Sequence, residues 1–169
     1  MQITNLALHT TVISFTFLLS LEANSTPVPD SFSHMIETLA AATAKGGNSV
    51  IAQWPGKTLS LPSEHSGRPQ VIHSGPIAMG DGLHASSSEI RLSDNNAVKL
   101  MILRLEGTCI TPADIAKKYP VNKMFDFPQP NNPDPVNYRR VDLQGIQVSF
   151  GFRGQAPGCL TDVVFNPNP

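Results

Sequence analysis

Hydrophobic residues recur at helical spacing over residues 31–45. The repeating positions are Phe32, Met35, Ile36, Leu39 and Thr43. They fall on one face of a helix of about four turns. Asp30 and Ser31 are candidate N-caps, and two glycines at 46–47 provide the stop. The pattern predicts a one-faced helix that must pack against another element of the fold.

The next segment reads as short strands and loops. Strands are predicted at 50–54 and 57–61, on either side of a Pro-Gly turn, and again at 70–73 and 77–79. The strongest sheet signal follows, because residues 89–92 and 97–105 flank an Asp-Asn-Asn turn and read as a hairpin. The second strand of that hairpin is apolar on both faces, so we expect it to be central and covered on each side.

A short helix over 112–119 carries specific sequence signals at both ends. Thr111 is the predicted N-cap, Pro112 suits the first helical position, and Asp114 completes a capping-box pattern. Tyr119 precedes a proline, which ends the helix. Further on, strict alternation of apolar and polar residues predicts a half-buried strand over 146–153, and 159–165 is the predicted closing strand.

Between these elements lies a proline-rich segment, residues 121–136. Its prolines are Pro128, Pro130, Pro133 and Pro135. Regular secondary structure does not tolerate that density of proline, so we expect an ordered loop there. The whole pattern predicts an α+β fold: a single antiparallel sheet with one N-terminal helix and one short helix, closed by one disulfide.

The N-terminus has the features of an export signal. Residues 12–21 form an uncharged apolar run that is too short to span a membrane but fits a secretory signal. Small residues at Ala23 and Ser25 offer two cleavage positions. We therefore expect a signal peptide over 1–25 and one exported, soluble domain over 26–169. The alternative is a short buried N-terminal helix.

Two cysteines, Cys109 and Cys159, are the only ones in the chain. Export would take the protein into a compartment where disulfides persist, and a Cys–Cys bridge is therefore the favoured reading. The alternative makes one of them a nucleophile or a zinc ligand. An odd thiol in an oxidising compartment fits poorly, and zinc sites cluster their ligands at shorter spacing.

Charge excludes some classes of partner. All 12 basic residues lie beyond position 25, and of the 13 acidic residues one, Glu22, lies before it. The chain from 26 onward thus carries 12 basic and 12 acidic residues and has a formal charge of zero. Nucleic-acid binding and polybasic membrane docking both need a basic surplus, so neither is expected.

Motifs of the common enzyme classes are lacking. The sequence holds no nucleophile elbow, zinc helix, phosphate loop or dinucleotide fingerprint. The best candidate stretch, 80–88, brings Asp81, His84, Ser86 and neighbouring serines together, but a turn followed by the polar start of a strand is the favoured reading of it. His73 and His84 lack a third metal ligand at recognisable spacing. We expect no catalytic, cofactor-binding or metal site, and no enzyme activity.

Several short motifs over roughly 85–165 resemble a known group of proteins. They are Cys109-Ile110-Thr111, Asp114-Ile115, Tyr119-Pro120, the proline-rich loop, Gly151-Phe152 and Cys159-Leu160. The pattern is similar to that of small bacterial periplasmic immunity proteins encoded beside type VI secretion effectors, especially phospholipase effectors. The resemblance implies a periplasmic protein that binds a cognate effector and covers its active site, with no cofactor.

Loops on a rigid scaffold are the expected binding surface of such a protein. The residues expected to bind the partner are Met124, Phe125, Asp126, Phe127, Asn131 and Asp134, with His65 and Arg68 in a second loop region. The apolar members of this set are equally suited to packing the loop onto the protein's own sheet. Two other functions remain open from the sequence: an envelope domain that binds lipid or cell-wall fragments, and a small exported hydrolase using His84.

Overall fold

The computed structural model describes residues 30–56, 70–80, 82–119, 123–126, 135–154 and 158–167. Its elements, in chain order, are α1 (Asp30–Lys45), α2 (Gly47–Ala52), β1 (Gln70–Ser74), β2 (Ile77–Gly80), β3 (Leu83–Leu92), β4 (Val98–Gly107), α3 (Pro112–Lys118), β5 (Lys123–Asp126), β6 (Asn137–Leu143), β7 (Ile146–Arg153) and β8 (Cys159–Asn166). The signal peptide predicted for 1–25 and the strand predicted for 57–61 lie outside the described residues.

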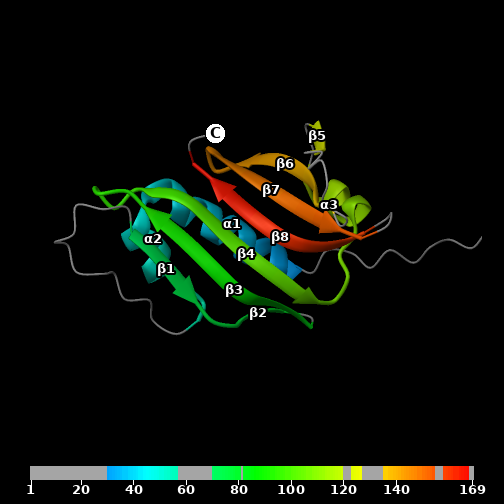
Figure 1. Cartoon of the computed structure of the whole chain (residues 1–169), viewed down its shortest axis with the longest axis horizontal. Helices are drawn as coiled ribbons and strands as arrows, with labels where there is room; N and C mark the ends of the chain where they lie inside the picture. The colour runs from blue at the N-terminus through cyan, green and yellow to red at the C-terminus, as the bar shows by residue number, and fades with distance from the viewer. Residues whose placement is uncertain are drawn as a thin grey trace, which may run out of the picture.

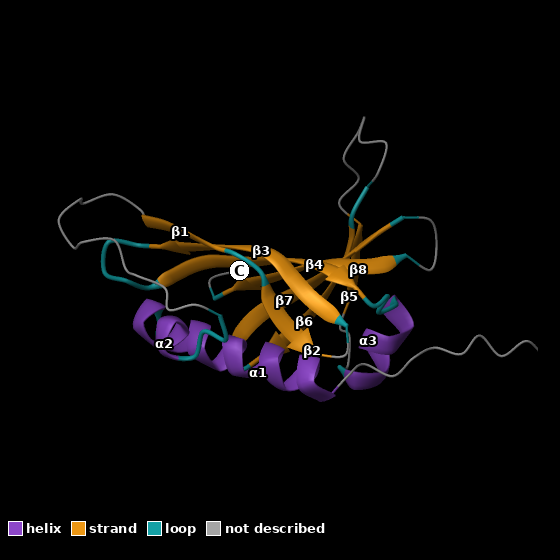
Figure 2. Cartoon of the chain, turned by 90° about the horizontal axis from the view of Figure 1, so that it is seen from below, coloured by secondary structure: helices purple, strands orange, loops and turns teal. Residues whose placement is uncertain are grey.

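The strands form one antiparallel sheet in the order β1-β3-β4-β8-β7-β6-β5, and β2 also pairs with β3. Figure 1 shows β8 in the middle of this sheet, between β4 and β7. The three helices lie along one side of the sheet (Figure 2). The predicted α+β class, with one antiparallel sheet, an N-terminal helix and a short helix, is therefore confirmed.

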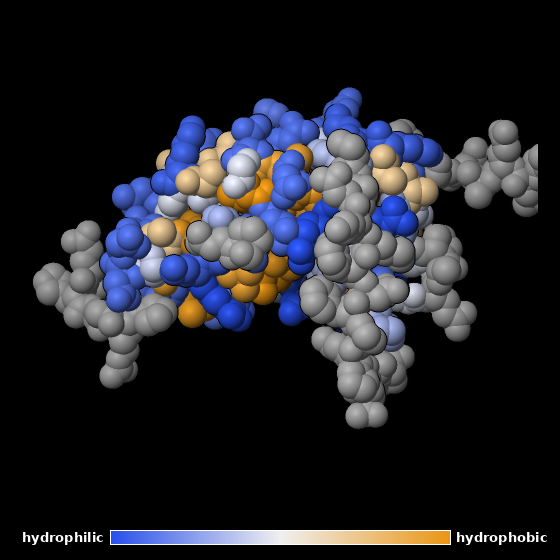
Figure 3. Space-filling model, turned by 90° about the horizontal axis from the view of Figure 1, so that it is seen from above, coloured by the Kyte–Doolittle hydropathy of each residue, from blue (hydrophilic) through white to orange (hydrophobic). Residues whose placement is uncertain are grey.

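Helix α1 forms where the apolar repeat predicted it. Phe32, Ile36 and Leu39 are completely buried and belong to the same core as the inward-facing strand residues. Not every apolar side chain is covered, since Met35 and Ile51 are only partly buried against the core. In the space-filling view, hydrophobic residues reach the surface near the middle of the molecule and hydrophilic residues border them (Figure 3).

The strand predicted at 50–54 is wrong, because this segment belongs largely to helix α2. Gly46 turns the chain between the two helices with a φ of 105°, a value that glycine adopts without strain. The amide of Gly47 then donates to the Asn96 carbonyl at 2.9 Å, which ties α2 to the β3–β4 turn. Val50 is buried in the core from this helix. Tertiary contacts thus override the β-propensity of the Val-Ile pair.

The hairpin predicted around residues 94–96 is confirmed as β3 and β4, and both strands extend further than expected. Strand β4 is central, as predicted, but it is not covered equally on both faces. Met101 and Leu103 point to the helices and are fully buried, whereas Leu100 and Ile102 on the other face are only half-buried. The described helices all lie on one side of the sheet (Figure 2). Among the described residues, no helix or strand therefore covers the face of β4 that carries Leu100 and Ile102.

The proline-rich segment contains a strand that was not expected. Strand β5 pairs with β6 over four residues, from Lys123 opposite Arg140 to Asp126 opposite Asn137. It precedes the first of the four prolines, which explains how a strand fits into this segment. Strand β6 itself pairs with β7 over its full length.

Helix α3 begins with the predicted capping box. The Asp114 amide donates to Oγ1 of Thr111 at 3.3 Å, and the Thr111 amide donates to Oδ2 of Asp114 at 2.9 Å. Asp114 is 1% exposed, so its carboxylate is bound to the helix start rather than presented to solvent.

Replacing the cap tests how much this box stabilises the protein. We expect Thr111→Ala to lower the free energy of unfolding by about 1 kcal/mol, because the helix loses its side-chain acceptor. Thr111→Ser keeps the hydroxyl and is expected to cost less than half as much. Urea denaturation of the three proteins measures the difference, and equal stability of wild type and Thr111→Ala would contradict it.

Candidate functional site

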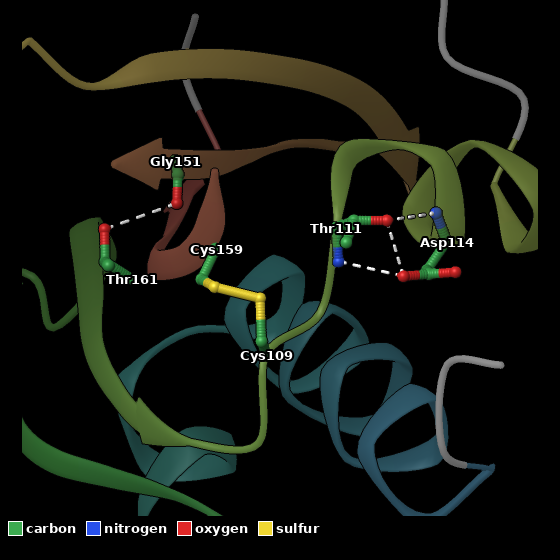
Figure 4. Close-up of a disulfide and its surroundings, with 6 residues drawn as sticks. All are labelled: Cys109, Thr111, Asp114, Gly151, Cys159 and Thr161. Atoms are coloured by element: carbon green, nitrogen blue, oxygen red, sulfur yellow. Dashed lines mark hydrogen bonds between the residues drawn. A yellow bond between two sulfur atoms is a disulfide. The ribbon is translucent and has the colours of Figure 1, made fainter. Parts of the chain in front are cut away.

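The disulfide predicted from the sequence is present. Cys109 and Cys159 are bonded at an S–S distance of 1.98 Å, with their Cα atoms 5.0 Å apart. The bridge links the segment after β4 to the first residue of β8, close to the capped start of α3 (Figure 4). Next to it, the Leu160 amide donates to the Ile110 carbonyl at 2.9 Å. The bridge is therefore a structural bond, and neither cysteine is available as a nucleophile or metal ligand.

Residues predicted to bind a partner fall mainly outside the described part of the chain. Phe127, Asn131 and Asp134 of the proline-rich loop lie outside it, as do His65 and Arg68 of the second loop region. Met124, Phe125 and Asp126 lie on β5, where the backbone of Phe125 pairs with Tyr138. These three residues of the predicted binding surface therefore lie in the edge strand of the sheet.

Asp81 of the 80–88 stretch lies outside the described residues, and the rest of this stretch forms ordinary strand contacts. His84 lies at the start of β3, and its Nε2 is 3.7 Å from a Glu106 carboxylate oxygen on β4. The Ser86 hydroxyl donates to the Arg104 carbonyl at 3.4 Å. Among the described residues, no hydrogen bond joins His84 to a serine. The same residues contain no cluster of three His, Cys, Asp or Glu side chains that is able to hold a metal ion.

The face of the sheet turned away from the helices, here called the open face, carries two rows of neighbouring side chains. Strand register fixes these rows because alternate residues share one face of a sheet. The first row is Ser87, Arg104, Asp162, Gly151 and Tyr138. The second row is Glu89, Ile102, Val164, Ser149 and Arg140. Both rows run from β3 to β6 across the centre of the sheet.

An ion pair lies in the middle of the first row. Nη1 of Arg104 is 2.6 Å from Oδ1 of Asp162, and the Thr161 hydroxyl donates to Oδ2 at 2.8 Å. The Asp162 side chain is 2% exposed, whereas that of Arg104 is 57% exposed. Both carboxylate oxygens therefore have a partner, as a buried charge requires, and the guanidinium group still reaches solvent.

Tyr138 lies next to this pair in the first row, separated from Asp162 by Gly151. A Cβ atom on Gly151 would be 2.7 Å from Cε1 of Tyr138 and 3.1 Å from the Asp162 Cβ, so only glycine allows this close packing. Burial raises the pKa of Tyr138, and the negative charge of Asp162 raises it further, while Arg104 and Arg153 act in the opposite direction. Tyr138, Asp162 and two arginines thus form one electrostatic cluster on the open face.

Two shallow hollows flank the central strands of the open face. One, of about 110 Å³, lies over β1, β3 and β4 and includes His73, Glu89, Ile102 and Arg104 in its lining. The other, of about 240 Å³, lies over β6, β7 and β8 and is lined by Tyr138, Arg140, Gln147, Ser149, Val164 and Asn166. The β4–β8 pair separates them. The open face is therefore an uneven surface with two shallow hollows, suited to contact with the surface of another protein, rather than one deep cavity.

Sequence reasoning did not find this cluster, although one signal was present. Asp162 is an acid within a mainly apolar closing strand, and an acid at such a position calls for a buried partner. Arg104 interrupts the apolar run of β4 in the same way. Arg139 and Arg140 are adjacent in the sequence, but they point to opposite faces because they are consecutive in β6.

Comparison with known proteins gives little further information. No family model matches the chain, and no curated protein matches it. One solved structure, a DUF4309 family protein (YjgB) from Bacillus subtilis subsp. subtilis str. 168, aligns with 82% of this chain and 99% of its own. The identity is 13% and the TM-score 0.41. In the described residues, no helix is long and apolar enough to cross a membrane.

Proposed function

We propose that this protein is a periplasmic, non-catalytic inhibitor that binds a secreted antibacterial toxin and covers its active site. The observation that carries the proposal is the open face, a broad surface on a disulfide-bonded sheet, with Arg, Tyr and half-buried aliphatic residues at its centre. Arg and aromatic residues around an apolar centre are enriched in protein–protein interfaces. A type VI secretion phospholipase effector is the proposed toxin, on the sequence resemblance.

The disulfide supports the proposed compartment. Such bonds persist in oxidising environments such as the bacterial periplasm and are rare in the cytosol. The Cys109–Cys159 bond agrees with the export signal expected at residues 1–25. A toxin that acts on membrane lipids from the periplasm would meet its inhibitor there.

Strand β5 connects the open face to the proline-rich loop. It pairs with β6 at the sheet edge, and Phe125 is the register partner of Tyr138. The segment that follows β5 contains four prolines, and proline restricts the conformations open to a chain, which reduces the entropy lost on binding. We propose that residues of this loop contribute to the binding surface.

A titration with a purified type VI phospholipase effector tests the function, and an effector encoded by an adjacent gene would be the first choice. Wild type is expected to bind it and to protect cells against it. Phe125→Ala is expected to weaken binding about tenfold or more, because buried aromatic anchors contribute most of the energy of an interface. Asp126→Ala, at the proposed polar rim, is expected to change affinity less than threefold. Calorimetry measures both effects.

His84→Ala is the matched control, since His84 lies outside the two rows of the open face and makes only a surface contact with Glu106. Its affinity and protection are expected to equal those of wild type. Each variant is first checked for an unchanged melting temperature. Absence of binding by wild type would remove the inhibitor function, and a hydrolysis rate that disappears in His84→Ala would replace it with the hydrolase alternative.

A further inference from the structure

We infer that Arg104 is the anchor with which the open face binds a carboxylate side chain, Asp or Glu, of a protein partner. Ile102 and Val164, in the adjacent row, take the apolar side chains next to that carboxylate. This inference deepens the proposed function and rests on it insofar as the partner is a protein. It assigns the centre of the contact to β4 and β8, whereas the sequence pointed only to loops.

Arg104 is already oriented for such a contact. Asp162 holds Nη1 at 2.6 Å and is itself fixed by the Thr161 hydroxyl. Because Asp162 is buried and the Arg104 side chain is 57% exposed, one end of the guanidinium group is fixed while more than half of the side chain remains exposed. A guanidinium group presents its donors in a planar fork that matches a carboxylate. Less side-chain entropy is lost on binding when the fork is held in place beforehand.

The surrounding charges favour an acidic partner. The acid of this cluster, Asp162, is covered, whereas Arg104 and Arg153 are exposed. Both arginines are close enough to Tyr138 to lower its pKa, and Arg140 lies in the next row. On the β3 side of Arg104, Glu89 lies against Arg91 and Glu106 lies against His84. On the β6–β7 side, the charge that the open face presents, from Arg140 and Arg153, is positive. An approaching carboxylate is attracted to it, and a basic side chain is repelled.

Apolar residues beside Arg104 distinguish a protein partner from a bare anion. Ile102 and Val164 are direct register partners, and both are half-buried on the open face. A hollow lies on each side of this pair, one including Ile102 and the other Val164. A phosphate group or a membrane surface would leave these residues unused, whereas an acidic residue flanked by aliphatic ones matches both parts of the surface.

NMR titration of the full domain with short peptides tests the inference. The probe is acetyl-Leu-Glu-Leu-amide, and acetyl-Leu-Gln-Leu-amide is its uncharged match. We expect the Glu peptide to shift the methyl signals of Ile102 and Val164 and the Nε–H signal of Arg104, with a Kd of about 1 mM. The Gln peptide is expected to bind at least about tenfold more weakly, because it lacks the charge-assisted hydrogen bonds.

The variant must not leave Asp162 as an unpaired buried charge, since that alone destabilises a fold. The double variant Arg104→Gln/Asp162→Asn removes both charges, and Asn keeps the shape of Asp, while Gln leaves a shorter, uncharged polar side chain at position 104. Arg104→Lys is the second variant. It keeps a positive charge beside Asp162 but loses the planar arrangement of donors in the guanidinium group. We expect the double variant to lose the peptide shifts and Arg104→Lys to retain them at reduced affinity.

Three results would overturn the inference: no shifts at peptide concentrations of about 20 mM, equal shifts with the Gln peptide, or the same methyl shifts with inorganic phosphate alone. The last result would indicate that the open face binds phosphate groups rather than a protein carboxylate. Effector titration separates this inference from the proposed function. Equal binding of the effector by wild type and the double variant overturns the anchor only. Peptide binding without effector binding supports the anchor and overturns the inhibitor function.

Discussion

Replacing both bridging cysteines, Cys109→Ala and Cys159→Ala, is expected to lower the free energy of unfolding by about 4 kcal/mol. The bond closes a loop of 50 residues, and the expected loss is the chain entropy that the unfolded state regains. Both cysteines are exposed, so alanine leaves no buried cavity that would add to this value. For a domain of this size the melting temperature should fall by about 15 °C.

Differential scanning calorimetry of the double variant measures this change. Wild type treated with reductant should melt at the same temperature as the variant, and the variant itself should not respond to reductant. This comparison isolates the bond from any effect of the side-chain replacement. A variant that melts within a few degrees of oxidised wild type would contradict the chain-entropy account.

Phe150→Ala is expected to cost about 3–5 kcal/mol, in the range found for removing a buried aromatic ring. Phe150 is completely buried on β7, and its ring is stacked on that of Tyr119 with centroids 5.5 Å apart. Tyr119 follows α3 directly, so this contact attaches the short helix to the sheet. The cavity would therefore weaken the packing of α3 as well as the core.

Two further variants serve as controls for Phe150→Ala. Ser149→Ala, the neighbouring residue on the open face, is expected to change stability by less than about 0.5 kcal/mol. Tyr119→Phe keeps the stacked ring and removes only a hydroxyl that is 3.4 Å from the Ser33 carbonyl oxygen. It should cost about 1 kcal/mol. Urea denaturation compares the three proteins, and a Phe150→Ala loss no larger than that of Tyr119→Phe would contradict the packing argument.

Local signals were sufficient wherever one pattern governed a segment. The apolar repeat of α1, the alternation of β7 and the capping box of Thr111 all specify their elements within a few residues. The segment 50–54 was mistaken for a strand because its β-propensity is local, while the hydrogen bond from Gly47 to Asn96 that holds α2 is not. Short apolar runs are ambiguous between helix and strand for this reason.

The candidate site was harder to predict than the fold. The disulfide required only compartment and spacing arguments, because the chain has two cysteines. The Arg104–Asp162 pair joins residues 58 positions apart, and it depends on β4 and β8 becoming neighbours in register. Strand order is not encoded in any single segment, so sequence periodicity placed both residues in strands without bringing them together. The loops that the sequence favoured lie mostly outside the described residues.

The central position of β8 has a consequence for how the protein folds. Strands β1–β4 form one group and β5–β7 another, and they belong to one sheet only through β8, which pairs with β4 on one side and β7 on the other. The ribosome makes both groups before it makes this strand. Assembly must therefore await a late, long-range pairing, which slows folding. Cys159 is the first residue of β8, so oxidation fastens the strand at the step that unites the two groups.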